Sequence, residues 1–123
     1  MISFESFRME SGTPIYLQIL LFIKRGVIAG TICDGDELPS RRVLSAHLGV
    51  NPNTVQKAYR LLEEDGLICS HTGSRSFMQI TAEKTDDIRR ELLETDIKSM
   101  VSTLRQMGLS KDDAISLLDT WWK

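Results

Sequence analysis

The fold of this chain is decided by residues 40–66, SRRVLSAHLGVNPNTVQKAYRLLEEDG, in which two consecutive helices are predicted around a tight turn. Ser40 is a favourable N-cap for the first helix, and Gly49 ends that helix. Asn51 and Pro52 form the strongest helix-start signal in the chain, because a capping Asn precedes Pro at the first helical position. These signals predict a short helix, a glycine turn and a longer helix.

The spacing of the apolar residues predicts which faces of the two helices are buried. In the first helix we expect Val43, Leu44 and Leu48 to point inward. In the second helix, spacings of three and four residues assign four side chains to the core: Val55, Ala58, Tyr59 and Leu62. The polar and basic side chains of the second helix are then directed outward: Asn53, Thr54, Gln56, Lys57 and Arg60.

Elements on both sides of this pair complete the predicted fold. Before it, Pro14 opens a helix that carries apolar residues at steps of four and ends near Gly30. After it, residues 67–70 and 75–80 are predicted as two short strands around a turn that contains Gly73. This order of elements is typical of a winged helix-turn-helix. The predicted fold class is mainly α with a small β-hairpin.

After Thr81 the chain changes to helix formers and charged residues, which predict one long helix and one short helix. Five apolar residues of the long helix repeat at intervals of four and three and form a heptad-like seam: Leu93, Ile97, Met100, Leu104 and Met107. Three more residues widen it: Ile88, Leu92 and Val101. Gly108 ends this helix, and Ser110 and Asp113 resemble a capping box that opens the last helix.

The long helix and the last helix form a tail that we expect to hold two copies of the chain together. The last helix carries Trp121 and Trp122, and so small a chain has little apolar surface with which to cover them and the seam. We therefore predict a homodimer built by the tail. The expected division is residues 1–81 for the winged helix-turn-helix and residues 82–123 for the two-helix dimerisation tail.

The length and composition of the chain restrict its class. With 123 residues it is long enough for one domain and a small appendage, and 41% hydrophobic and 26% charged residues are typical of a soluble globular protein. The net charge is only −2, yet residues 38–62 contain four basic side chains and no acidic one. This local excess of positive charge suggests an anionic partner.

Several other classes of protein are not supported. The two cysteines, Cys33 and Cys69, are isolated from each other and from any metal-binding pattern, so we expect no metal and no disulfide. The longest nearly apolar stretch, residues 15–23, is too short to cross a bilayer, and a cytoplasmic protein is expected. There is no phosphate-binding glycine loop and no pair of carboxylates in a credible pocket, so neither an enzyme nor a cofactor is predicted.

Three short motifs in order resemble the DNA-binding domain of GntR-type bacterial transcription regulators. They are GDELPSRR at residues 35–42, LGVNPNTV at residues 48–55, and YRLLEEDGLI at residues 59–68. The resemblance extends from about residue 14 to residue 80. Within that family, Pro14-Ile15-Tyr16, Asn51-Pro52-Asn53-Thr54 and a tail of only two helices are similar to the short YtrA-type subgroup.

This resemblance implies DNA contacts at particular positions. Arg42, with Arg41 beside it, would reach DNA from the start of the first helix of the pair, since a guanidinium suits a phosphate or a guanine edge. Short polar side chains at the start of the second helix would meet phosphates or base edges: Asn51, Asn53 and Thr54. Gln56 is placed to pair with adenine, and Lys57 and Arg60 are better placed for phosphates.

The hairpin departs from the family pattern. Residues 72–77, TGSRSF, keep Gly73 and Phe77, but Arg75 replaces the second glycine and moves the charge along by one position. His71 and Arg75 are therefore the candidate contacts of this wing. Contact by the wing is less strongly implied than contact by the helices.

Two functions of different classes remain open from the sequence. The leading one is a sequence-specific transcription regulator, expected to be a repressor, that binds a palindromic operator in double-stranded DNA as a homodimer. The resemblance further implies control of a transporter operon. The alternative is a winged-helix protein-interaction module that does not bind DNA. The basic, acid-free residues 38–62 favour the first, because an interaction module has no need of them.

Overall fold

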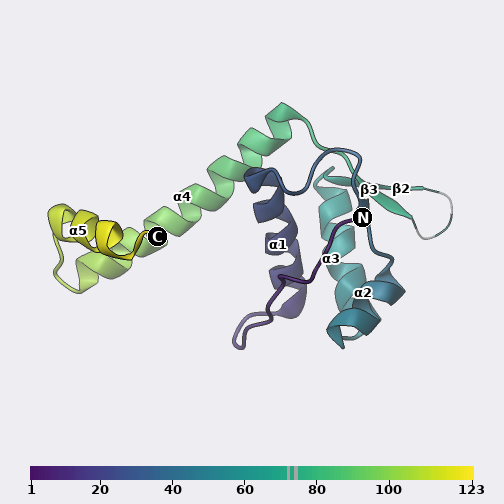
Figure 1. The fold of residues 1–123 in the computed structure, drawn as a ribbon, viewed down its shortest axis with the longest axis horizontal. Helices are drawn as coiled ribbons and strands as arrows, with labels where there is room; N and C mark the ends of the chain where they lie inside the picture. The colour runs from purple at the N-terminus through teal and green to yellow at the C-terminus, as the bar shows by residue number, and fades with distance from the viewer. Residues whose placement is uncertain (72, 74) are drawn as a thin grey trace. The chain divides into compact units, whose positions relative to one another are not determined.

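A computed structural model describes residues 1–71, 73 and 75–123 and divides them into two units, Met1–Ile88 and Arg89–Lys123 (Figure 1). The first unit contains six complete elements and the start of a seventh. They are α1 (Ile15–Ala29), β1 (Glu37–Leu38), α2 (Arg41–Leu48), α3 (Pro52–Glu64), β2 (Ile68–Ser70), β3 (Ser76–Met78) and the beginning of α4 (Ala82–Gln106). The predicted class, mainly α with a small hairpin, is confirmed.

The predicted helix signals act as expected. The Ser40 hydroxyl accepts a hydrogen bond from the backbone N–H of Val43, at 3.2 Å, and caps α2. The Asn51 side chain accepts from the N–H of Asn53, at 2.8 Å, and caps α3. Gly49 has a φ of 69°, a left-handed conformation that ends α2 and that glycine adopts without strain. The turn between the two helices is therefore encoded locally.

The core of the first unit lies between α1, α2 and α3. All four residues predicted on the inner face of α3 are buried, and so are Ile19 and Ile23 of α1. The prediction for Val43 is wrong, since this side chain is 58% exposed while Leu44 is buried. At 100° per residue, Val43 lies about 140° around the helix from Leu48, so the two cannot share one narrow buried stripe.

The sheet has one strand more than the predicted hairpin. Its order is β1-β3-β2 with both pairs antiparallel, and Glu37 and Leu38 of β1 pair with Phe77 and Ser76 of β3. The sequence indicated only an extended step at residues 38–39. With β1 on one side and β2 on the other, β3 is the central strand, and the hairpin is fixed to the segment that leads into α2.

The N-terminal segment, residues 1–10, completes this core, which the sequence analysis did not anticipate. Ile2, Phe4 and Phe7 are buried, and the N–H of Ile2 donates to the carbonyl of Glu37 at 2.8 Å. The rings of Phe4 and Phe7 lie 4.9 and 5.4 Å from the ring of Phe22 on α1, measured between centroids. This segment therefore joins β1 to α1.

The start of α4 belongs to the first unit. The Lys84 ammonium donates to the carbonyls of Gly66, which follows α3, and Gln79, which follows β3. Ile88 was expected to widen the apolar seam of the tail, but it is buried and lies in the first unit. The first two turns of α4 are thus part of the winged helix-turn-helix.

The second unit contains the rest of α4 and α5 (Lys111–Trp121). Gly108 takes a left-handed conformation after α4. The predicted capping box is present, because the Ser110 hydroxyl accepts from the N–H of Asp113 and the Asp113 carboxylate accepts from the N–H of Ser110. The hydrogen bond from the backbone N–H of Ser110 to the Asp113 carboxylate lowers the pKa of Asp113. Within the described residues, no helix is both long enough and apolar enough to cross a membrane.

Candidate nucleic-acid interface

The outward face of α3 carries the polar side chains that the sequence predicted there. Asn53, Gln56, Lys57 and Arg60 are exposed, and Thr54 is half-buried. Asn51, at the N-terminus of the same helix, is also exposed. Figure 1 shows α2 and α3 side by side, and the short connection between them brings the residues of both helices to one end of the first unit.

The charges along α3 are divided between its ends. Its first turns contain no acidic residue, while Glu63, Glu64 and Asp65 lie at its C-terminal end. The Ser70 hydroxyl donates to the Glu63 carboxylate, and Asp65 pairs with the buried ammonium of Lys24 at 3.5 Å. The helix dipole adds partial positive charge at the N-terminus. An anion is therefore attracted to the N-terminal half of α3 and repelled from its C-terminal end.

The two basic residues of α3 have different partners. The Arg60 guanidinium forms an exposed ion pair with Glu64, with Nε 3.8 Å from the carboxylate oxygen. The Lys57 ammonium lies 4.0 Å from the centroid of the Tyr16 ring, in a cation–π contact, and no carboxylate pairs with it among the described residues. Lys57 thus has an aromatic ring and not a carboxylate as its described partner, at the edge of the polar face.

The two arginines of α2 are not equivalent. Arg42 is exposed. Arg41 is half-buried, and its guanidinium lies 5.7 Å from the centroid of the Tyr59 ring. Its Nε atom is buried and has no hydrogen-bond partner among the described residues. Of the two, Arg42 is the one free to extend toward a ligand.

A hydrogen bond that the sequence did not reveal fixes α3 against the start of α2. The buried hydroxyl of Tyr59 donates to the carbonyl of Pro39 at 2.6 Å, and Pro39 immediately precedes the cap of α2. Burial raises the pKa of Tyr59 far above its ordinary value, although the nearby charge of Arg41 opposes this shift. The bond helps to set the geometry of the helix pair.

The two wing candidates contact other residues of the first unit. Arg75 donates from Nε and Nη2 to the two carboxylate oxygens of Glu37, at 3.1 and 3.3 Å, and its guanidinium lies 5.1 Å from the centroid of the Phe77 ring. The hydrogen bond lowers the pKa of Glu37 and raises that of Arg75. The His71 ring stands edge-on to Phe77, and its Nε2 lies 3.5 Å from the sulfur of Cys69.

Two residues of the wing motif, Thr72 and Ser74, lie outside the described residues. The ion pair of Arg75 with Glu37 could not be found from local patterns, because the two residues are 38 positions apart in the sequence. The exposed candidates of α3 thus lie on the outward side of that helix, whereas the wing arginine is held by an acidic neighbour.

The second unit exposes most of the predicted seam. Of the seven candidate dimerisation residues, only Leu104 is half-buried. The other six are exposed: Leu93, Ile97, Met100, Met107, Trp121 and Trp122. The two tryptophans are 75% and 81% exposed. Apolar residues gathered in this way on short helices are a feature of protein–protein interfaces.

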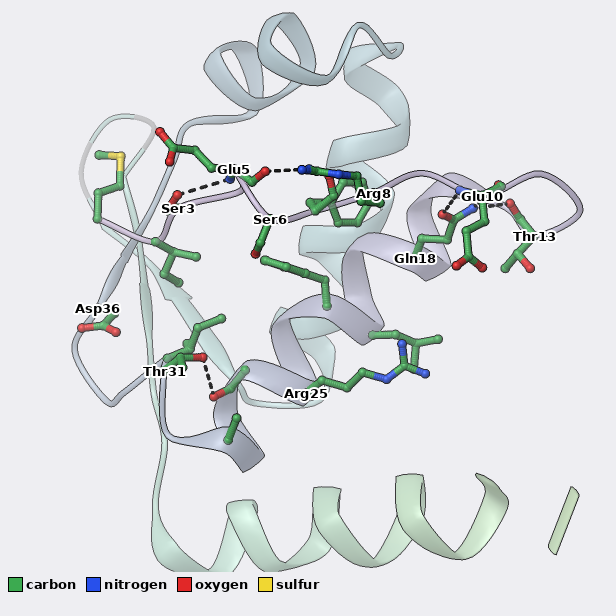
Figure 2. Close-up of a pocket in the computed structure, with 18 residues that line it drawn as sticks. Ser3, Glu5, Ser6, Arg8, Glu10, Thr13, Gln18, Arg25, Thr31 and Asp36 are labelled. Carbon is green, nitrogen blue, oxygen red and sulfur yellow. Dashed lines mark hydrogen bonds between the residues drawn. The ribbon is translucent and has the colours of Figure 1, made fainter. Parts of the chain in front are cut away.

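A groove of about 950 Å³ lies between the N-terminal segment and α1 (Figure 2). Gln18 lies at one end of it: its amide accepts from the N–H of Glu10 and donates to the carbonyls of Glu10 and Thr13. Two further polar side chains that line the groove, Arg8 and Thr31, also donate hydrogen bonds to backbone carbonyls. Over the described part of the chain, no three His, Cys, Asp or Glu side chains are grouped as a metal site requires.

Comparison with known proteins agrees with this geometry. The sequence pattern of the family described as "Bacterial regulatory proteins, gntR family" matches residues 15–78. The chain is 30% identical over 114 residues to the uncharacterized HTH-type transcriptional regulator YhcF of Bacillus subtilis, covering 93% of this chain and 94% of that protein. It is 41% identical over 76 residues to the HTH-type transcriptional repressor YtrA of Bacillus subtilis, covering 62% of this chain and 58% of that protein.

A solved structure extends the similarity to the tail. The GntR family transcriptional regulator from Listeria monocytogenes superposes with a TM-score of 0.81 at 28% sequence identity, covering 91% of this chain and 98% of that chain. The family match covers more than half of the chain, and the exposed polar face of α3 lies within it. The chain belongs to the gntR family of bacterial regulatory proteins and is a DNA-binding transcription regulator of the YtrA type.

Proposed function

We propose that this protein is a repressor that binds a palindromic operator as a homodimer, with one α3 helix entering the major groove at each half-site. The observation that carries the proposal is the exposed polar face at the N-terminal half of α3, free of acidic side chains. The name of the repressor YtrA supports repression as the mode of action. A transporter operon as the target rests on the resemblance to the short subgroup alone.

Base reading is assigned to an exposed residue of α3 that carries no charge of its own. Gln56 can form two hydrogen bonds with adenine in the major groove. The side chains around it would fix the register by meeting phosphates or neighbouring base edges: Asn51, Asn53 and Thr54. Arg42, which is exposed, is assigned to a guanine edge or a phosphate. Lys57 and Arg60 are assigned to phosphates, Arg60 after exchange of its Glu64 partner.

Three of the predicted contact residues have weaker support. Arg41 packs on the Tyr59 ring, so its contribution to DNA binding would come with a change of rotamer. His71 and Arg75 are engaged with Phe77 and Glu37. We therefore propose that the helices supply most of the affinity and that the wing adds little in the wild-type protein.

Dimerisation is assigned to residues 89–123 of the predicted tail, and DNA binding to residues 1–88, which include the first turns of α4. The exposed seam of the second unit supports this assignment. Two tethered winged helices gain about 10²–10⁴ in affinity when their spacing fits the DNA repeat. A single winged helix that reads only a few base pairs gains no such factor.

Selection of binding sequences from a random pool of double-stranded DNA tests the function directly. We expect an enriched palindrome, which then serves as the operator in further assays. Arg42→Ala and Gln56→Ala should each weaken operator binding by about 1–3 kcal/mol, and Gln56→Ala should also relax base preference at one position per half-site. An equal loss on operator and random DNA for Gln56→Ala would remove it as a base reader.

Sedimentation of the full chain tests the dimer. We expect a dimer at tens of micromolar, and a monomer for Met100→Lys, because a charge in a buried seam is costly. Ser99→Lys is the matched control, since it adds the same charge next to the seam rather than in it. A monomeric wild-type chain that still binds the palindrome tightly would refute this part of the proposal. Failure to enrich any sequence would favour a protein-interaction module instead.

A further inference from the structure

The contact between Tyr16 and Lys57 joins the beginning of α1 to the outward face of α3. Tyr16 is half-buried in the second position of α1, and Lys57 is exposed on α3. The two helices pack against each other in the first unit, where Figure 1 shows them side by side. The ammonium of Lys57 stands 4.0 Å from the centroid of the Tyr16 ring, which is close for such a contact.

An aromatic partner has a different effect on a lysine than a carboxylate has. An acid would neutralise the ammonium and compete with a phosphate for it, as Glu64 does for Arg60. A ring attracts the ammonium through its quadrupole and leaves the net charge in place. It also restricts a side chain that would otherwise populate many rotamers, and ordering such a side chain opposes binding. Lys57 is therefore held in position while its charge stays available.

We infer that Tyr16 is a positioning residue for DNA binding: its ring holds the Lys57 ammonium beside the polar face of α3, ready to meet a phosphate. This inference rests on the proposed phosphate contact of Lys57. The role belongs to the ring and not to the phenolic hydroxyl, which has no hydrogen bond among the described residues. Removing the ring should cost affinity only while Lys57 is present.

The test compares two substitutions of Tyr16, each made alone and together with Lys57→Ala. Tyr16→Phe keeps the ring, and Tyr16→Leu removes it but preserves an apolar side chain at a half-buried position. The dissociation constant of the full chain is measured on the selected operator at several salt concentrations, and thermal unfolding shows that each variant is folded. If Tyr16→Leu does not fold, Tyr16→Met takes its place.

We expect Tyr16→Phe to bind within about twofold of the wild type and Tyr16→Leu to bind about twofold to fivefold more weakly, the size of an exposed cation–π contact. In the Lys57→Ala background, Tyr16→Leu should have no further effect. Nuclear magnetic resonance gives an independent readout, because a ring shields the Lys57 methylene protons beside the ammonium. That shift should persist in Tyr16→Phe and vanish in Tyr16→Leu.

Four outcomes would overturn the inference. If Tyr16→Leu weakens binding equally with and without Lys57, Tyr16 acts through helix packing. If Tyr16→Leu tightens binding, the ring competes with the phosphate for the ammonium. If Lys57→Ala changes neither the affinity nor the salt dependence, the proposed phosphate contact fails and the inference with it. An inert Tyr16→Leu beside an effective Lys57→Ala would instead overturn the inference alone.

Discussion

The buried hydrogen bond between Tyr59 and Pro39 predicts a measurable change in stability for Tyr59→Phe. The substitution keeps the ring, which is 1% exposed, and removes only the hydroxyl that donates at 2.6 Å. A typical intramolecular hydrogen bond contributes about 1 kcal/mol net, and a buried carbonyl left without a partner costs about 1–3 kcal/mol. We expect the free energy of unfolding to fall by about 1–3 kcal/mol.

The same substitution should change how stability depends on pH. Burial raises the pKa of Tyr59, so the folded state binds the phenolic proton more tightly than the unfolded chain, whose Tyr pKa is about 10. This contribution to stability is complete below pH 10 and is lost as the pH rises above it, by up to about 1.4 kcal/mol per pH unit. Tyr59→Phe removes that loss.

Urea unfolding followed by circular dichroism, at neutral pH and at several pH values above 10, measures both effects. The matched control is Tyr16→Phe, which removes a hydroxyl that makes no hydrogen bond among the described residues and should change stability little. The reasoning would be refuted by a Tyr59→Phe protein within about 0.5 kcal/mol of the wild type, the usual range for a neutral surface substitution. An unchanged loss of stability at high pH would refute the role of burial.

Three further predictions concern the wing, the tail and the boundary between the units. Glu37→Gln removes the charge of the carboxylate that holds Arg75, so the protein should bind the operator more tightly, and the salt dependence of its affinity should steepen by about one ion. Adding Arg75→Ala should reverse both changes. Filter binding over a range of salt concentrations measures the affinity and its salt dependence. A chain ending at Arg90 contains the whole first unit, so it should unfold cooperatively in calorimetry yet sediment as a monomer; a dimer would place the interface outside the tail. Ser110→Ala removes the cap of α5 at a cost of about 1 kcal/mol in helix stability and leaves the DNA-binding residues unchanged. The helix content measured by circular dichroism should therefore fall. Unchanged helix content would show that packing within the tail alone holds α5.

The three central helices could be predicted because their signals are local. Ser40, Asn51 and Gly49 act within two or three residues of their own positions. Strand β1 could not be predicted, since it has only two residues and depends on pairing with β3 much later in the chain. The N-terminal segment has no periodic pattern, and its burial depends on Phe22 of α1.

The candidate site, like the fold, could be predicted from the sequence only in part. Helical spacing was enough to predict which side chains of α3 face outward, because a core stripe on one side leaves the other side exposed. Spacing could not reveal what each charge contacts. Lys57 meets a ring of α1 and Arg75 meets a carboxylate of β1, and both contacts exist only once the elements have packed. Sequence reasoning therefore identified the face but not the partners that modulate it.

The N-terminal segment also decides which part of this regulator can be exchanged as a module. The family pattern covers residues 15–78, yet the core of the first unit includes Ile2, Phe4, Phe7 and Ile88, which lie beyond it on both sides. Burying a large apolar side chain contributes about 1.5–3 kcal/mol, and whole domains are stable by only about 5–15 kcal/mol. A chimaera that transplants only the family segment onto another tail would thus lose most of its stability, whereas transplanting residues 1–88 carries the complete folding unit.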